Sequence, residues 1–364
     1  MIHIAGGTSA HTELSFDLDR LWSYNLYERS RWGAGLKLSL RDSLDISGYA
    51  AYGVRDQQWK GGVGVAYKIP LSHRGGTVYI GIARDYYAAA SRRLQASNIT
   101  DLAGMSAVMT QLMDDRRGIT LGYRFANRRA TYTFEGRAFE GYRLYRSDLR
   151  PVYLVDGSSL ERVDGLELCL TMERRSGFAA QLLVAGRSNW RILMQYDRTF
   201  PLGPLDFSTF AQAGLSFPYC DSYYRFDLGG TYGSPLWFRN SMLTLRPYEH
   251  VTTRFAFASL RLKVRKPLFS LWNKTFVVGS YPRPMVGVNG VYGGTYRVYD
   301  SYDTEPGMST YTLYSIGAVE LMAGVDGLIR WGVADYGVAY CLRPYPLDDG
   351  KLRQVLLFTA ALAF

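Results

Sequence analysis

The chain has 364 residues, of which 47% are hydrophobic and 20% charged, and it contains 29 tyrosines and 38 glycines. No uncharged apolar run approaches the roughly 18 residues that a membrane-spanning helix requires, which excludes a helical membrane protein. The formal net charge is +10, but the basic residues are spread along the chain and form no recognition motif, so we expect no nucleic-acid partner.

The first predicted strand, WGAGLKLSLR at residues 32–41, alternates between apolar and polar positions. Trp32, Ala34, Leu36, Leu38 and Leu40 occupy every second position. Because successive side chains of a strand point to opposite faces, a period of two means that the strand separates two environments. A soluble sandwich would place a protein core on the apolar side, whereas a membrane barrel would place lipid there.

The next two predicted strands, 44–54 and 59–69, repeat this alternation and follow the first as a meander. Each apolar stripe spans about the 9 to 11 residues that a tilted strand needs to cross hydrocarbon, whereas a soluble strand is nearer 5 or 6 residues. Antiparallel order places Trp32, Tyr52 and Trp59 at one height on the apolar face. We therefore predict that they belong to an aromatic belt at a membrane interface.

The same alternation recurs at residues 119–125, 166–172 and 256–264, and the chain ends in an alternating strand that closes with Phe364, a fourth predicted interface aromatic. The predicted fold class is all-β: a transmembrane, antiparallel, up-and-down β-barrel of about sixteen strands, with 12 or 14 as alternatives. One of the sixteen begins near Ser222. Two others begin near Tyr314 and Ile329, with a tight turn at residues 325–328.

We divide the chain into an amino-terminal periplasmic segment, residues 1–31, and an outer-membrane barrel, residues 32–364. If Phe364 marks the periplasmic interface, sixteen strands place Trp32 and Trp59 on the same side. The connections 231–251 and 294–313 then face outward. The long connections 87–117 and 142–164 come out periplasmic, where turns are usually short, so the strand count contains an irregularity or an error. Residues 101–113 fit a short amphipathic helix or a flexible loop equally well.

Strand parity predicts a cationic lumen. The lumen-facing basic residues are Lys37, Arg41, Lys60, Lys68, Arg124, Arg261 and Lys263. Glu135, Glu167 and Glu173 share this face, and we expect them to pair with lumen arginines.

Small residues mark a candidate seam between the first and last predicted strands: Gly33, Gly35, Ala361 and Ala363. Few large side chains would lock such a closure, so the seam could open laterally. The alternative is that small residues fit the curvature of the barrel.

No enzyme, metal or cofactor motif is present in the sequence. Cys169, Cys220 and Cys341 are far apart and the four histidines are scattered, so we expect no metal site and no cofactor. The pairs Ser72 with His73 and Glu249 with His250 would point to opposite faces of a strand, so we expect no catalytic residues. No secretion signal is visible in the first residues of this sequence.

Two stretches, SYNLYERSRWGAGLKLSL and GYAAYGVRDQQWKGGVGVAY, resemble the barrel portion of an uncharacterised outer-membrane family of Bacteroidota. In that family a carboxypeptidase-regulatory-like domain precedes the barrel. The stretch GAVELMAGVDGLIRWGVADYGVAYCLRP resembles the last strands of the wider assembly-factor and surface-antigen barrel superfamily. The chain departs from these patterns at Ser30, where the family favours Gly, and it has no Arg-Gly-aromatic motif of the kind that assembly factors carry on an inward loop.

The resemblance implies an outer-membrane protein of a Gram-negative bacterium that serves envelope biogenesis or transport and is not an enzyme. Its implied partners are the barrel-assembly machinery, for insertion, and outer-membrane lipid or lipopolysaccharide. The lumen cations support an alternative, a porin-like channel that prefers anions. An outer-membrane lipid hydrolase is a third, less favoured hypothesis.

Overall fold

The computed structural model describes most of the chain. The described residues are 2–5, 12–17, 21–25, 28–41, 43–70, 75–88, 113–144, 162–186, 189–217, 220, 222–229, 242–245, 250–273, 278–300, 309–331, 334–344 and 353–362. They belong to two compact units. Unit 1 comprises Met1–Leu193, Tyr219–Arg225 and Tyr232–Ser234, and unit 2 comprises Met194–Pro218, Phe226–Thr231 and Pro235–Phe364.

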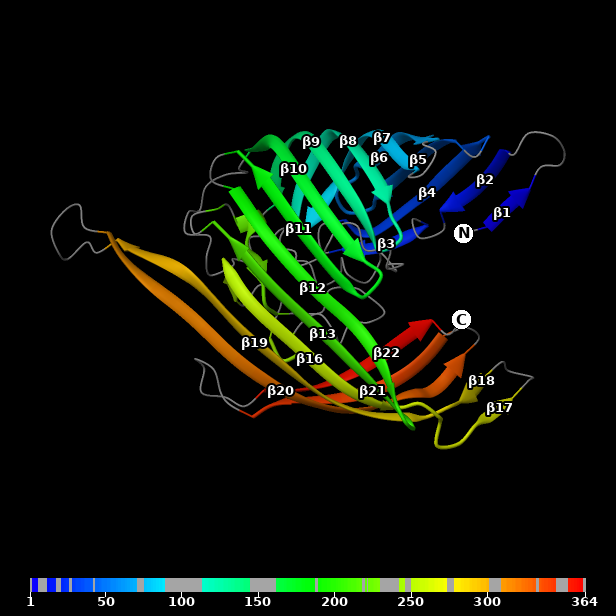
Figure 1. Cartoon of the computed structure of the whole chain (residues 1–364), viewed down its shortest axis with the longest axis vertical. Coiled ribbons are helices and arrows are strands. Elements are labelled where there is room, and N and C mark those ends of the chain that lie inside the picture. Colours follow the sequence, from blue (N-terminus) through cyan, green and yellow to red (C-terminus); the bar gives the residue numbers. More distant parts are fainter. Residues whose placement is uncertain are drawn as a thin grey trace. The chain divides into compact units, whose positions relative to one another are not determined.

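Unit 1 is an antiparallel meander (Figure 1). Its strands are β1 (Ile2–Ala5), β2 (Thr12–Asp17), β3 (Trp22–Asn25), β4 (Arg29–Leu40), β5 (Leu44–Gly53), β6 (Trp59–Ile69), β7 (Gly76–Ala88), β8 (Met113–Ala126), β9 (Ala130–Leu144), β10 (Arg162–Arg174), β11 (Phe178–Ala185) and the start of β12 (Asn189–Leu202). Each strand from β4 to β11 pairs with the next strand along the chain, which is the up-and-down order that the alternation predicts.

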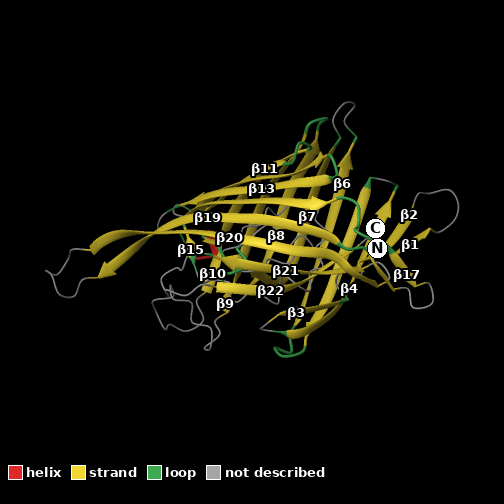
Figure 2. Ribbon diagram, turned by 90° about the horizontal axis from the view of Figure 1, so that it is seen from below, coloured by secondary structure: helices red, strands yellow, loops and turns green. Residues whose placement is uncertain are grey.

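Unit 2 continues the same pattern of pairing. Its strands are the rest of β12, β13 (Leu205–Ser216), β14 (Phe226–Asp227), β15 (Val251–Thr252), β16 (Arg254–Val264), β17 (Leu271–Asn273), β18 (Val278–Ser280), β19 (Arg283–Asp300), β20 (Ser309–Trp331), β21 (Ala334–Arg343) and β22 (Arg353–Leu362). β13, β16, β19, β20, β21 and β22 pair in that order, all antiparallel. Strands dominate the described chain (Figure 2), which confirms the all-β, up-and-down fold class.

Two of the predicted strand boundaries are wrong. No strand begins at Ser222, because Ser222–Tyr224 forms a single 3-10 turn, η2. The expected tight turn at residues 325–328 is an irregularity inside one continuous strand, β20, where the register with β21 shifts between Val325 and Ile329. Gly327 makes this irregularity possible, since it adopts a φ of 66° that favours glycine.

One strand before β4 escaped the sequence analysis. β2 and β3 pair with the same edge of β4, from Thr12 opposite Leu40 to Asn25 opposite Arg29. They act as one interrupted strand, which lies in the segment that the sequence analysis assigned to the periplasm. Leu14, Phe16, Trp22 and Tyr24 keep one phase of alternation, but the charged residues Asp19 and Arg20 interrupt the pattern, and the register with β4 shifts by two residues between Asp17 and Trp22. Fifteen strands from β4 to β22, without β14, β15, β17 and β18, together with this one keep the expected count of about sixteen.

The corrected strand order removes the conflict over the long connections. In unit 1 the connections 89–112 and 145–161 leave the same edge as the turn at residues 54–58, and we call this edge the loop edge. Short turns at residues 41–43, 127–129 and 175–177 lie at the opposite edge, the turn edge. An odd number of strands from β4 to β22 no longer supports the expectation, made from sixteen strands, that Trp32 and the carboxyl terminus share one side.

Within the described ranges, the structure contains no helix that is long and apolar enough to cross a membrane. The expected helix at residues 101–113 lies outside the described residues except for Met113, which begins β8.

The pairing of β2 with β4 can be tested by a disulfide. Leu14 lies directly opposite Leu38, and directly opposite Cβ atoms in a sheet are about 4.5–5.5 Å apart, close to the separation that a disulfide needs. Leu14→Cys with Leu38→Cys is expected to form a cross-link on mild oxidation, measured by peptide mapping with and without reductant. Leu14→Cys with Ser39→Cys, whose side chains point to opposite faces, is the control and should stay reduced. Equal cross-linking of the two pairs would contradict the register.

Candidate functional site: the inner face of the strands

The two faces of the strands show inverted burial in both units. On what we call the outer face, large apolar side chains are exposed: Leu166 is 72% exposed, Val63 65% and Leu121 56%. The opposite, inner face buries charged and polar side chains. In unit 1 these include Lys60, Asp114, Arg116, Arg143, Glu167 and Gln181, and in unit 2 they include Gln212, Asn289, Glu320 and Arg343. Soluble proteins show the opposite arrangement, with apolar side chains inside and charges in water.

An aromatic row crosses the outer face of unit 1 near the loop edge. Trp32 pairs with Tyr52, and Tyr52 pairs with Trp59, as the sequence predicted. Trp22 of β3 extends the row, since it lies opposite Trp32, and the sequence analysis missed it because β3 was not predicted. Trp32 and Trp59 are 58% and 68% exposed. Phe364 lies outside the described residues.

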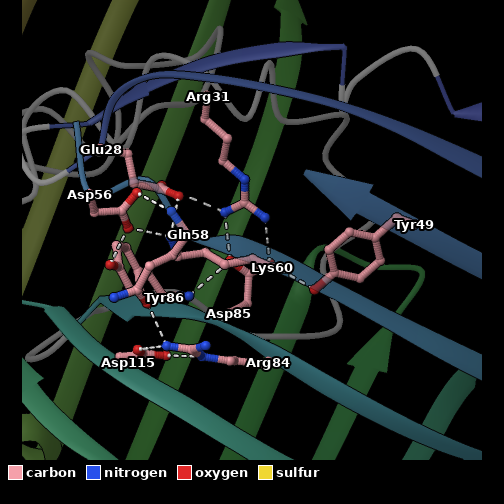
Figure 3. A network of polar contacts seen from close by, with 10 residues as sticks. All are labelled: Glu28, Arg31, Tyr49, Asp56, Gln58, Lys60, Arg84, Asp85, Tyr86 and Asp115. Carbon is pink, nitrogen blue, oxygen red and sulfur yellow. Dashed lines mark hydrogen bonds and ion pairs between the residues drawn. The ribbon is translucent and has the colours of Figure 1, made fainter. Parts of the chain in front are cut away.

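A polar network, which we call the rim network, lies at the loop edge of unit 1 (Figure 3). At its centre Lys60 is completely buried, with its Nζ 2.7 Å from Glu28 Oε1 and 2.5 Å from Asp56 Oδ2. Glu28 is completely buried as well and stands in the turn before β4. Tyr86 donates a hydrogen bond to Asp56, and Lys60 Nζ lies 4.0 Å from the centre of the Tyr86 ring.

Arg31 and Asp85 form the second part of the rim network. Arg31 donates two hydrogen bonds to the Asp85 carboxylate, and Tyr49 donates a third at 2.7 Å. Nearby, Arg84 binds Asp115 through Nε and Nη2, at 3.2 and 2.7 Å. These residues come from β4, β5, β7 and β8, and they meet because alternate strands start and end at the same edge of a meander.

The rim network also controls the charge of Asp56, which lies in the turn between β5 and β6. Burial by itself would raise the pKa of the Asp56 carboxyl, but hydrogen bonds from Lys60 and Tyr86 outweigh it, so its pKa lies below its usual value. Asp56 therefore stays ionised near neutral pH and continues to balance the buried ammonium of Lys60.

A second cluster on the inner face of unit 1 centres on Arg116 of β8. Arg116 Nη2 lies 2.9 Å from Asp114 Oδ2 and Nη1 lies 3.0 Å from Glu167 Oε1. The guanidinium carbon is 4.1 Å from the centre of the Phe139 ring and 3.6 Å from that of Tyr223. Arg116 is thus stacked between two rings and bridges two carboxylates, an arrangement that suits the planar guanidinium.

The η2 turn, which lies in the connection between β13 and β16 and belongs to unit 1, joins this cluster. Tyr224, in the η2 turn, donates a 2.9 Å hydrogen bond to Glu167 Oε1, and Tyr223 stacks on Arg116. Within unit 2, a later part of this connection contacts Glu320 of β20, which is fully buried. Glu320 accepts hydrogen bonds from the backbone N–H groups of Leu243 and Thr244, at 3.0 and 2.9 Å, and from the Thr244 hydroxyl.

Three of the seven predicted lumen cations, Lys37, Lys60 and Lys263, lie beside carboxylates. Lys37 lies 3.0 Å from Asp45, and Lys263 lies 2.5 Å from Asp326. The carboxylates Glu135 and Glu167 form the expected ion pairs with arginines, whereas Glu173 forms none in the described structure. The other predicted cations are Arg41 in the turn after β4, Lys68 in β6, Arg124 in β8 and Arg261 in β16.

The candidate seam is not found at β4. Gly33 and Gly35 lie in a strand whose two edges are paired, with β5 on one side and with β2 and β3 on the other. These glycines therefore do not face an open edge. Ala361 pairs with Asp335 inside the β21–β22 ladder, and Ala363 lies outside the described residues.

Among the described residues, no group of three or more His, Cys, Asp or Glu side chains is arranged to hold a metal ion. Of the sequence-level hydrolase candidates, only His250 is described, and Ser72, His73 and Glu249 lie outside the described residues.

No protein-family model and no curated protein match the chain. Among solved structures, the chain is similar to BamA from Haemophilus ducreyi lacking POTRA domains 1–3, with a TM-score of 0.49, 13% identity, and coverage of 97% of this chain and 70% of that one. It is also similar to CdiB from Acinetobacter baumannii (0.43, 9%, 97% and 59%) and to CdiB from Escherichia coli (0.42, 12%, 99% and 64%). The chain thus spans less than two thirds of either CdiB chain.

Removing the central cation of the rim network should destabilise the fold strongly. Lys60→Met leaves the buried Glu28 carboxylate without its closest cation, and breaking a buried pair in this way costs about 3–5 kcal/mol in the free energy of unfolding. Lys37→Met is the matched control, because Lys37 is 43% exposed and its pair with Asp45 contributes at most about 1 kcal/mol. Urea unfolding in lipid vesicles measures both. Equal losses would contradict a special role for Lys60.

Proposed function

We propose that the chain forms a transmembrane β-barrel of the outer membrane of a Gram-negative bacterium. The observation that carries this proposal is the inverted burial. Exposing rows of Leu, Ile and Val to water while enclosing charges would be unfavourable for a soluble protein on both counts. Hydrocarbon outside and a polar interior remove both costs, and a strand can cross hydrocarbon only when its backbone groups are paired, as they are here.

We propose that the loop edge faces the outside of the cell. In outer-membrane barrels the periplasmic turns are short and the outer loops are long. The long connections of unit 1 leave the loop edge, so the aromatic row and the rim network would stand at the outer interface. Aromatic rings suit that height because they have both apolar and polar parts.

We propose a non-enzymatic role in transport or in assembly of the envelope. The motifs at residues 23–67 and 317–344 support placement among assembly-factor and surface-antigen barrels. We also propose that the chain belongs to the Bacteroidota outer-membrane family in which a carboxypeptidase-regulatory-like domain precedes the barrel. The contacts of the connection between β13 and β16 support a regulated passage, since Glu167 holds its η2 turn within unit 1 and Glu320 holds Leu243 and Thr244 within unit 2. Insertion by the barrel-assembly machinery and contact with lipid or lipopolysaccharide follow from the proposed location.

An open channel that prefers anions is the alternative, and the ion pairs weigh against it. Lys37, Lys60 and Lys263 lie beside carboxylates, which reduces the positive potential that would attract anions.

Heat-dependent mobility on denaturing gels tests the barrel proposal. Extracted in detergent, the unheated protein should migrate as a compact species, and boiling should convert it to a slower species of the full chain mass, because a paired sheet in detergent resists unfolding at room temperature. A protein that is monomeric and well folded in buffer without detergent would contradict the proposal.

Planar-bilayer recording separates a regulated passage from an open channel. The wild-type chain is expected to show little steady conductance, because the connection between β13 and β16 stays bound on the inner face. Glu167→Ala removes the acceptor for Tyr224 and the partner of Arg116, so brief openings should become more frequent. Glu140→Ala, on the outer face, is the control. Steady, anion-selective conductance of the wild type would instead favour the porin alternative.

A further inference from the structure

A groove interrupts the outer face of unit 1 where strands β4 to β7 run side by side. Its volume is about 770 Å³, and its walls are almost entirely apolar. Ala34, Gly48 and Ala50 form its floor, and the walls include Leu36, Val63 and Ile82, which are 47%, 65% and 55% exposed.

The groove follows from the cross-strand register. Ala34, Ala50 and Gly61 lie opposite one another in three neighbouring strands, directly below the row that contains Trp32, Tyr52 and Trp59. In the next row down, Gly48 lies between Leu36 and Val63. Small side chains in adjacent positions of neighbouring strands leave a depression that the larger side chains around it cannot fill.

Two arginines stand at the upper end of the groove, at the height of Gly61. Arg84 lies opposite Gly61 on one side and directly opposite Arg117 on the other. Like charges directly opposite each other in a sheet are destabilising unless they are neutralised. Both are exposed, at 42% and 69% of their side chains, although each has a carboxylate neighbour, Asp115 and Glu140. Arg117 binds Glu140 through Nε, and no contact of its terminal nitrogens is seen in the described structure.

We propose that this surface binds a membrane lipid with a phosphorylated head group. An acyl chain lies in the groove, and the phosphate lies between Arg84 and Arg117. The proposal rests on the proposed transmembrane function and names a specific partner for the outer face. Arg84 and Ile82 are consecutive outward positions on β7, about 6.6 Å apart along the strand, so one lipid can contact both.

The head group must supply most of the preference for this lipid. Any acyl chain in the groove exchanges with other chains of the bilayer, so the hydrophobic effect gives little net gain there. A phosphate, in contrast, offers several acceptors to two guanidinium groups and relieves their mutual repulsion. The aromatic row places both arginines at the interface, where lipid phosphates lie.

Two lipids with the same chains test the proposal: dimyristoyl phosphatidic acid, which carries a phosphate, and dimyristoylglycerol, which does not. Native mass spectrometry of the detergent-extracted full chain, titrated with each lipid, measures both affinities. We expect the wild type to bind the phosphatidic acid at least tenfold more tightly. Arg117→Gln should reduce this preference by about tenfold, the effect of one hydrogen bond to a charged group. Gly48→Leu, which has room for a side chain but fills the groove, should weaken binding of both lipids.

Matched variants on the same face control for general effects. Arg162→Gln removes an exposed outer-face arginine that has no arginine opposite it, and Gly136→Leu fills an outer-face glycine position outside the groove. Both should bind like the wild type. Equal affinity of the wild type for the two lipids would overturn the proposal, as would a lipid-free dimer of the chain, which would identify a second copy as the occupant. A positive heat-mobility test with no phosphate preference would overturn this inference and leave the transmembrane proposal intact.

Discussion

The fold depends on giving the charged side chains that are buried on the inner face partners within the protein. Every buried cation described on the inner face of unit 1 must therefore find its ligands within the protein, as Lys60 does with Glu28 and Asp56. Arg116 solves the same problem with two carboxylates and two rings, and the carboxylate of Glu320 solves it with backbone N–H groups. The inner face consequently carries clusters of polar contacts, and Lys60 with Glu28, Arg116 with Glu167 and Glu320 with Leu243 tie together segments that are distant in the sequence.

The alternation of side chains made the faces predictable. Strand period and length are local properties, so the exposed apolar face and the register of Trp32, Tyr52 and Trp59 could be derived from residues 32–69 alone. The cations Lys37, Lys60 and Lys263 could be placed on the inner face by the same rule. Their partners could not, because Glu28 stands in a turn and Asp326 comes from a strand more than sixty residues away from Lys263.

The sequence shows which side chains alternate, but it does not show whether those side chains are buried or exposed. This explains why a strand was predicted near Ser222 where none begins. Residues 222–228 alternate as a strand does, with Tyr224, Phe226 and Leu228 at every second position. In a transmembrane strand such residues would be exposed to lipid, but here all three are almost completely buried. The alternating side chains of this segment therefore make buried contacts. Counting the segment as a strand changed the strand number by one, and this reversed the membrane sides assigned to the first half of the chain. The missed β2 and β3 show the converse, a strand whose alternation is interrupted by the charged residues Asp19 and Arg20.

The β19–β20 pair is longer than a membrane requires. Its ladder continues to Asp300 opposite Ser309, in strands of 18 and 23 residues. About 9 to 11 residues suffice to cross the hydrocarbon, so roughly 8 residues of each strand, some 25 Å, extend past it. If this hairpin stands on the cell exterior, it is the part of unit 2 that proteases, antibodies and phage would meet first, and an epitope inserted at its tip would display the chain on intact cells.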